Sequence, residues 1–245
     1  MENNELKTAD YVVAFIDVLG ATSKICNDVD DSLNIIHRVY KDALISCGEV
    51  RNILKNDSEK PIVRIFSDNI VMACPVNTHG IDLAFRIVAG FVSIIQNRFM
   101  DNNIIVRGGI SYGSFFSDDV MVWGQALVHA YNIESSLAIY PRIIIDKALF
   151  EKVDISHFLF IPVYIKCDGD GEFFVDHLNY NHLEKDNVDR MIEHYQKLDA
   201  TIECLVLEAT SNTKALQKIN WLKNYLGQTK KDYCEYIKSR GETHE

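Results

Sequence analysis

Two aspartates, each at the end of a short apolar run, are the residues of this sequence best suited to chemistry. Asp17 ends the run 11–17 (YVVAFID), and Asp68 lies between the apolar runs 62–66 and 70–74. A β-branched run that stops at an aspartate is typical of a buried strand that brings a carboxylate to the end of a sheet. Two such carboxylates on neighbouring strands would bind a hard divalent cation, because Mg²⁺ and Mn²⁺ prefer oxygen ligands.

The turn that follows Asp17 adds an element suited to phosphate. Its residues are Leu19, Gly20, Ala21 and Thr22, and the free backbone N–H groups of a flexible turn can hold phosphates beside metal ions. A lone aspartate after a strand is commonly an N-cap or a turn residue. The prediction therefore depends on the two aspartates and the turn together, and it is metal-dependent phosphoryl chemistry on a nucleotide.

The composition limits the class of protein and its partners. Of 245 residues, 47% are hydrophobic and 24% are charged, as in an ordinary globular protein. The net charge of −10 argues against a nucleic-acid partner, because phosphate backbones need a basic face. No uninterrupted apolar run approaches the ~20 residues that span a bilayer, so we expect no membrane partner either.

The cysteines and the N-terminus favour a cytoplasmic location. The six cysteines are scattered without a Cys-x-x-Cys pair, which argues against both a zinc site and a disulfide framework. The first residues, MENNELK, lack the basic and apolar regions of a signal peptide. We expect the protein in a reducing cytoplasm.

Alternating strands and helices should position the two aspartates. The pattern predicts a strand, a helix, a hairpin with Asp68 at its tip, a helix and a strand, over about 10–17, 28–54, 62–67 with 70–75, 79–99 and 104–112. This β-α-β-β-α-β order is that of a ferredoxin-like core, in which the hairpin tip and the end of the first strand lie side by side. Asp17 and Asp68 should meet there.

The remainder of the chain should complete the sheet and add helices. We expect a turn at 56–61, a helix from about 124 to before 141, a short strand at 142–145 and a closing hairpin formed by 158–166 and 172–177. From about 184 onward the pattern is helical, with apolar residues spaced to pack on the core or on a partner chain. The expected fold class is α+β, a mixed, mainly antiparallel sheet flanked by helices, with a core at 8–178 and a helical extension at 182–240.

A glycine-rich strand gives the sequence a more specific character. Residues 106–113 read VRGGISYG, and glycine in a strand suggests a close backbone approach or a bulge. Together with FIDVLGAT at 15–22, FSDNI at 66–70 and GQALVHAYNIES at 124–135, this strand resembles the class III nucleotide cyclase catalytic domain over about residues 8–178. The FSD, RGGI and GxAL…AYxIE forms are similar to the stand-alone pyrimidine cyclases of bacterial anti-phage defence, the Pycsar type.

The resemblance implies a site and a reaction. Asp17, Asp68 and the carbonyl of Val18 would bind two Mg²⁺ or Mn²⁺ ions, and residues 19–22 would wrap the β- and γ-phosphates. The ribose 3′-hydroxyl would attack the α-phosphate and release pyrophosphate, giving a 3′,5′-cyclic nucleotide. The resemblance further implies a head-to-tail homodimer with sites shared between chains, and a separate effector protein that the cyclic nucleotide activates during phage infection.

Three positions depart from the pattern of the family. The helix asparagine and arginine that stabilise the transition state align with Val128 and Asn132, and the polyphosphate-binding lysine aligns near Asp170. Other basic residues could replace them: Arg107, Arg142, Lys147 and Lys166. Of these we take Arg107 as the catalytic candidate, with a structural strand-end charge as the alternative. Asn132 is kept as a candidate substrate-binding residue.

Base selection is predicted from the strand that precedes Asp68. Alternation puts Arg64, Phe66 and Asp68 on one side, and related cyclases have a base-reading side chain at the position of Arg64. An arginine only donates hydrogen bonds, so it would suit the carbonyl oxygens of a pyrimidine. This favours UTP, with CTP next. An arginine that extends from the strand to solvent is the alternative.

Two other functions stay open at this point. A degenerate cyclase-like domain that binds nucleotide or mediates dimerisation would explain Val128, Asn132 and Asp170. An ordinary adenylate cyclase would differ only in its base preference.

Overall fold

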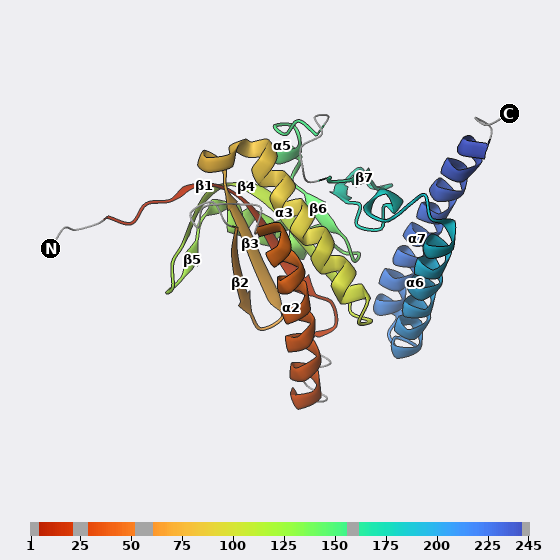
Figure 1. Ribbon diagram of the computed structural model, residues 1–245. Coiled ribbons are helices and arrows are strands. Elements are labelled where there is room, and N and C mark those ends of the chain that lie inside the picture. Colours follow the sequence, from red (N-terminus) through yellow and green to blue (C-terminus); the bar gives the residue numbers. More distant parts are fainter. Residues whose placement is uncertain (1–4, 22–28, 52–60, 156–161, 242–245) are drawn as a thin grey trace.

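A single sheet organises the computed structural model, which describes residues 5–21, 29–51, 61–155 and 162–241. The strand order is β2-β3-β1-β4-β6-β8-β7, with β5 paired to β4 (Figure 1). The strands are β1 (Ala9–Val18), β2 (Ile62–Phe66), β3 (Asn69–Pro75), β4 (Val106–Ser117), β5 (Val122–Trp123), β6 (Ile143–Ile145), β7 (Ile165–Cys167) and β8 (Phe173–Val175).

Helices flank this sheet and continue past it. They are α2 (Val29–Arg51), α3 (Val76–Met100), α4 (Gln125–Ser136), α5 (Lys147–Phe150), α6 (Val188–Glu208) and α7 (Thr213–Gly241), with a 3₁₀ turn at Tyr180–His182. The short elements β5 and α5 were not predicted. The expected strand from 158 is observed only from Ile165, since 156–161 lie outside the described residues, as does most of the expected turn at 56–61.

The predicted ferredoxin-like core is confirmed by the strand pairing. Neighbours in β2-β3-β1-β4 are all antiparallel, and β6 is parallel to β4. The predicted fold class, a mixed and mainly antiparallel sheet with flanking helices and helices at the C-terminus, is therefore confirmed.

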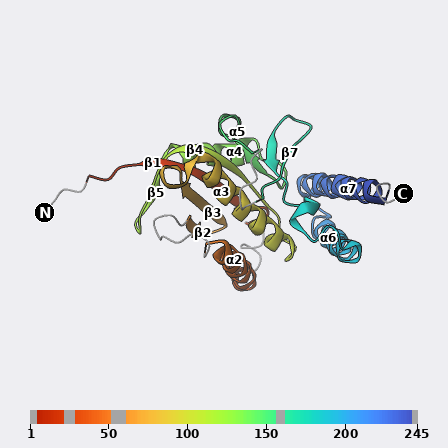
Figure 2. The same cartoon turned by 45° about the horizontal axis from the view of Figure 1, so that its top comes forward.

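Strand alternation assigns the two faces of the sheet to different helices. Val12, Ala14 and Ile16 belong to the large apolar cluster that includes residues of α2 and α3, whereas Val13 and Phe15 pack with Ala126 and Ala130 of α4. Figures 1 and 2 show α2 and α3 together on one face. A side chain near the end of β1 therefore faces either α2 and α3 or α4, depending on its position in the strand.

The glycines of β4 allow α4 and β1 to approach closely, as predicted. A Cβ on Gly109 would lie 2.5 Å from the carbonyl oxygen of Ala130, and one on Gly108 would lie 2.3 Å from that of Phe15. No real Cβ is found so near to backbone oxygen. These glycines fix α4 directly against the strand that carries Arg107.

The C-terminal helices form an apolar cluster of their own. Met191, Leu198 and Ile202 of α6 are buried with Leu222 and Leu226 of α7. The cluster also takes in Phe174 of β8, and α6 and α7 lie together at the β7 end of the sheet (Figures 1 and 2).

One described helix, α3, is long and apolar enough by composition to cross a membrane. Of its most apolar window, 56% is buried inside the protein. Its buried residues Phe85, Val88 and Phe99 belong to the main core, so its apolar character is used in packing against the sheet.

Candidate functional site

The pairing of β1 with β3 brings Asp17 and Asp68 to the same end of the sheet, as predicted. Asp17 is opposite Asn69 in the register, and the N–H of Val18 donates to the carbonyl of Asp68 at 3.1 Å. Asp68 lies in the two-residue connection between β2 and β3, next to Ser67 with φ +55°. Strand pairing and this backbone hydrogen bond therefore hold the two carboxylate-bearing residues next to each other.

Asp17 is held by a cation on the neighbouring strand. Asp17 and Arg107 are directly paired in the β1–β4 register, and Arg107 Nε donates to Asp17 Oδ2 at 3.2 Å. Burial raises the pKa of Asp17, Arg107 opposes that rise, and nearby Asp68 adds to it. Arg107, the predicted catalytic residue, is therefore in direct contact with a predicted metal ligand.

A third carboxyl group, missed by the sequence reasoning, completes this cluster. Glu134 of α4 is 3% exposed, and its Oε1 lies 2.6 Å from Arg107 Nη2. Burial is the main reason why the pKa of Glu134 is raised, and the Asp17 carboxylate raises it further. A signal was present: Glu134 follows the buried Ala126 and Ala130 at helical spacing, which would have placed this charged side chain on the side of α4 that faces the sheet.

Asp68 faces the side of the sheet covered by α2. With Ala21, Ser32 and Ile36 it lines a cavity of about 220 Å³, and its Oδ1 accepts a hydrogen bond from the Asn69 side chain at 3.2 Å. The expectation that Asp68 shares a side with Arg64 is wrong, because the turn at residue 67 interrupts the strand alternation.

Tyr40 of α2 lies close to both aspartates. Its side chain is 8% exposed and its hydroxyl has no hydrogen-bond partner among the described residues. Burial raises the pKa of Tyr40, and the charges of Asp68 and Asp17 raise it further. An unpaired buried hydroxyl is uncommon; here it is a donor within the field of the two carboxylates.

The predicted phosphate turn lies directly beside this pair. Leu19 N–H donates to the carbonyl of Ile105 at 2.9 Å, Gly20 is exposed with φ +80°, and Ala21 is buried. A left-handed conformation favours glycine, which explains Gly20. Thr22 lies outside the described residues.

The donors present suit a hydrated divalent cation. Among the described residues no group of three or more His, Cys, Asp or Glu side chains could hold a metal ion. Mg²⁺ is commonly bound by one or two carboxylates together with water and substrate phosphates. Asp17 and Asp68 supply those carboxylates. The backbone N–H of Val18, the residue after Asp17, is hydrogen-bonded to the carbonyl of Asp68.

The predicted base-reading residue Arg64 and the predicted substrate-binding residue Phe66 lie on the α4 side of the sheet. Phe66 is 47% exposed, and the Phe15 ring lies 6.3 Å from the Phe66 ring and 5.4 Å from that of Tyr131, centroid to centroid. Arg64 donates from Nη2 to the carbonyl of Asp118 at 3.1 Å. Phe66 is thus accessible, whereas the Arg64 guanidinium is engaged with the β4–β5 turn.

Asn132 does not lie beside Asp17 or Asp68 of the same chain. It is exposed on α4, as is Val128 one turn earlier, at 55% exposure. Glu134 lies on the opposite, buried side of the same helix. Asn132 and Val128 therefore face outward, where a second molecule could contact them.

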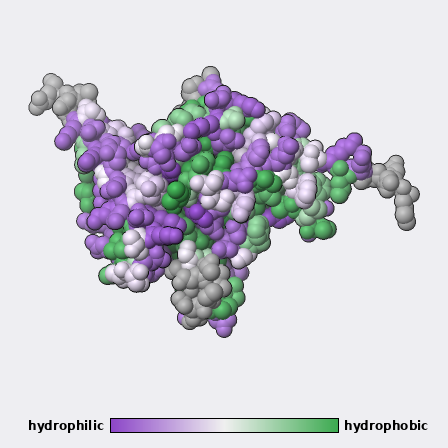
Figure 3. All heavy atoms as spheres, turned by 180° about the vertical axis from the view of Figure 1, so that it is seen from behind, coloured by the Kyte–Doolittle hydropathy of each residue, from purple (hydrophilic) through white to green (hydrophobic). Residues whose placement is uncertain are grey.

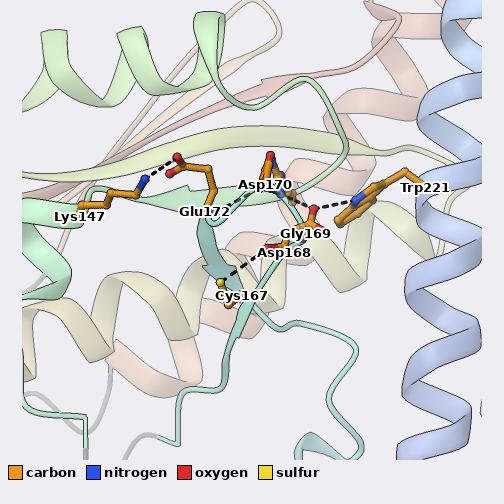
Figure 4. A network of polar contacts seen from close by, with 8 residues as sticks. Lys147, Cys167, Asp168, Gly169, Asp170, Glu172 and Trp221 are labelled. Carbon is orange, nitrogen blue, oxygen red and sulfur yellow. Dashed lines mark hydrogen bonds and ion pairs between the residues drawn. The ribbon is translucent and has the colours of Figure 1, made fainter.

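The other basic candidates are bound to acids near the β7–β8 hairpin. Arg142, 1% exposed, forms ion pairs with Asp168 and Asp170. Lys147 contacts Glu172 at 2.8 Å and Lys166 contacts Asp232 at 3.2 Å. Figure 4 shows the hairpin acids between Lys147 on one side and Trp221 of α7 on the other.

Comparisons with known proteins give similarities of fold. No protein-family model matches the sequence, and no curated protein matches it. The adenylyl cyclase CyaB from P. aeruginosa is similar with 14% identity and a TM-score of 0.46, over 69% of this chain and 95% of that chain. The guanylate cyclase domain of RhGC from Catenaria anguillulae, in complex with GTP, is similar with 14% identity and a TM-score of 0.47, over 70% and 98%.

A class III adenylyl cyclase-like ATP-binding protein from Pseudomonas aeruginosa is similar with 10% identity and a TM-score of 0.47, over 71% of this chain and 39% of its own. All three TM-scores lie below 0.5. The chemistry of the site is therefore inferred from its own residues and their geometry.

Proposed function

We propose that this protein is a metal-dependent nucleotide cyclase, a phosphorus–oxygen lyase that converts UTP or CTP to the 3′,5′-cyclic nucleotide and pyrophosphate. The observation that carries the proposal is the pair of carboxylates, Asp17 and Asp68, fastened by the Val18–Asp68 hydrogen bond beside the turn at Leu19 and Gly20. Hard cations and phosphate are the ligands that such an arrangement suits.

In this proposal Asp17, Asp68 and the Val18 carbonyl hold two divalent cations, Mn²⁺ or Mg²⁺. When bound, the ions would lower the pKa of the ribose 3′-hydroxyl and stabilise negative charge on the α-phosphate. The new bond joins O3′ to the α-phosphorus, the bond from that phosphorus to the oxygen bridging to the β-phosphate breaks, and the hydroxyl proton passes to water.

The chain's own residues bind and orient the substrate. Residues 19–22 would donate backbone N–H groups to the β- and γ-phosphates. Arg107 is oriented by its 2.6 Å ion pair with Glu134 and lies against Asp17. A guanidinium fixed in this way supplies positive charge where the reaction builds negative charge, which is the preorganised electrostatic stabilisation that enzymes commonly use.

The base would stack near Phe66. The exposed Phe66 ring, with Phe15 and Tyr131 next to it, offers an aromatic surface for a nucleobase. Arg64, on the same side of the sheet, would release Asp118 to donate to a pyrimidine carbonyl. This pairing supports UTP ahead of CTP.

A homodimer would complete the sites. Several large apolar residues are exposed on α4 and its surroundings, and Figure 3 shows apolar side chains near the middle of the face seen from behind. The exposed residues include Val128, Tyr131, Leu137, Phe66 and Trp123. Exposed apolar area of this kind marks interaction surfaces. A second copy docked there would bring Asn132 to the partner's nucleotide, and the cyclic product would act in the cytoplasm on a separate effector protein of anti-phage defence.

A nucleotide-binding module without turnover is the second candidate. The observation that favours it is Asp170, near which the resemblance would place a phosphate-binding lysine, and which is itself bound by Arg142. An adenylate cyclase is the third candidate. It would use the same site and differ only in the base of the nucleotide that it accepts.

The test is incubation of the protein with Mn²⁺ and each of ATP, GTP, CTP and UTP, with products identified by mass spectrometry. We expect a cyclic pyrimidine nucleotide from the wild-type protein and none from Asp68→Ala. A cyclic purine as the main product would overturn the base assignment. Tight binding of a triphosphate without pyrophosphate release would replace the cyclase by the binding module.

A further inference from the structure

Helix α7 of the C-terminal extension packs beside the β7–β8 hairpin and the start of β4, the strand that carries Arg107. Trp221 Nε1 donates to Asp168 Oδ2 at 2.8 Å, and its ring stacks on Tyr140 with centroids 5.5 Å apart and planes 7° apart. Leu222 is buried and, together with Ile105 and Val106, lines a narrow cavity. This face of α7 therefore reaches the start of β4, next to the turn that contains Leu19, whose N–H is bonded to Ile105.

Lys218 lies on this same face of α7. It precedes Trp221 by three residues and Leu222 by four, the spacing of neighbours along one side of a helix. It is partly buried and interacts electrostatically with Arg107, Asp17 and Glu134. Burial, and then the charge of Arg107, lower the pKa of its ammonium group. Within the described chain no acid forms a direct ion pair with Lys218.

The charges around Lys218 explain why a phosphate would suit it. Asp17 and Glu134 are in contact with a single guanidinium, that of Arg107. The basic residues of the hairpin region are committed elsewhere, Arg142 to Asp168 and Asp170, and Lys147 to Glu172. A partly buried cation without a direct partner is costly unless an anion is bound. Lys218 is thus available at the edge of the site.

We infer that Lys218 binds a phosphate group of the nucleoside triphosphate, so that the C-terminal helices supply a cation to this site, since Lys166 of the β7–β8 hairpin is paired with Asp232. This inference rests on the proposed function, because it assigns a residue to that same site. It makes the extension a part of the nucleotide site, held in place by the Trp221–Asp168 hydrogen bond, in addition to a packing element.

The experiment measures ligand binding, independently of turnover. Lys218→Gln, Lys218→Arg and the matched control Lys223→Gln, an exposed lysine of the same helix, are titrated by calorimetry with UTP and with inorganic tripolyphosphate, each in the presence of Mn²⁺. Loss of a charge-assisted hydrogen bond should weaken binding of both ligands about ten- to hundredfold in Lys218→Gln. Lys218→Arg should recover most of the affinity, and Lys223→Gln should bind as the wild type does.

The outcomes separate this inference from the proposed function. Unchanged affinity in Lys218→Gln overturns the inference, and if the midpoint of thermal unfolding falls at the same time, Lys218 only stabilises the fold. Binding of tripolyphosphate that depends on Lys218, without cyclisation of any triphosphate, keeps the inference and rejects the cyclase. Failure of the wild type to bind either ligand rejects both.

Discussion

Arg107 and Asp17 are direct partners across β4 and β1, with Nε and Oδ2 3.2 Å apart. The same guanidinium contacts the buried Glu134 at 2.6 Å. Asp17 is also one of the two carboxylates proposed to hold metal ions. A cation that binds Asp17 must therefore compete with, or displace, Arg107.

The first prediction follows from this competition. Arg107→Gln removes the positive charge next to Asp17, so the affinity for Mn²⁺ should rise several-fold, since like charges near the site repel. Turnover should fall about 10²–10³-fold, as when a preorganised charge is removed from an active site. Paramagnetic resonance of free Mn²⁺ gives the affinity, and product formation gives the rate.

Lys147→Gln is the control for this experiment, because Lys147 pairs with Glu172 away from Asp17. It should leave the Mn²⁺ affinity unchanged. If Arg107→Gln weakens Mn²⁺ binding while the fold is retained, Arg107 does not compete with the cation and its role is structural.

The second prediction concerns the glycines of β4. Gly109→Ala would place a Cβ 2.5 Å from the Ala130 carbonyl and 2.6 Å from Ile133 Cβ. Because backbone cannot move aside cheaply, α4 must shift, and the free energy of unfolding should fall by about 1–3 kcal/mol. Urea denaturation followed by circular dichroism measures the change. Gly227→Ala, where nothing lies within 4 Å, should be neutral or stabilising by up to about 1 kcal/mol.

The sheet and the aspartate pair could be predicted from the sequence for a physical reason. Short β-branched runs that end at Asp17 and flank Asp68 specify strands by themselves, and the β-α-β-β-α-β order then fixes which strand ends meet. The glycine-rich strand likewise indicated a close backbone approach or a bulge, and the structure shows the approach, between Gly109 and α4. Local pattern and topology were sufficient here.

The remaining features depend on packing between distant segments. Lys218 approaches Asp17 only because α7 folds back on β4, which no local pattern encodes. Asp68 turns toward α2 because Ser67 adopts φ +55° and breaks the alternation that the prediction assumed. Glu134 was not singled out in the sequence, although its spacing from Ala130 placed it on the buried side of α4.

The third prediction tests the contact between the hairpin and the core. Arg142 is buried beside the stacked rings of Tyr140 and Trp221, 5.6 and 5.7 Å from their centroids, and forms ion pairs with Asp168 and Asp170. Arg142→Met leaves both carboxylates without their cation, so we expect a loss of about 2–3 kcal/mol in the free energy of unfolding by urea.

Arg190→Met is the matched control, because its pair with Glu184 is exposed on both sides. Its effect should stay below about 1 kcal/mol. Equal losses in the two variants would contradict the view that Arg142 holds the hairpin.

The last prediction is a pH dependence of stability that arises at His177. This side chain is 3% exposed, and burial, followed by the charge of nearby His182, lowers its pKa from 6.5 to about 3. Between those values the unfolded chain binds a proton that the folded chain does not, so this contribution is fully present above pH 6.5 and is lost as the pH falls toward 3. The slope from one such group is at most about 1.4 kcal/mol per pH unit.

His177→Gln should flatten the dependence of the free energy of unfolding on pH between 6.5 and 4, whereas His129→Gln, at an exposed position of α4, should not. Burial also lowers the pKa of His182 and of His194, and both remain in the variant, so some slope should persist. The comparison therefore uses the difference between the wild-type and variant curves, which cancels those two groups and any constant loss of stability. If the difference is the same at pH 6.5 and at pH 4, His177 is protonated equally in the folded and unfolded chains, and burial does not keep its ring neutral.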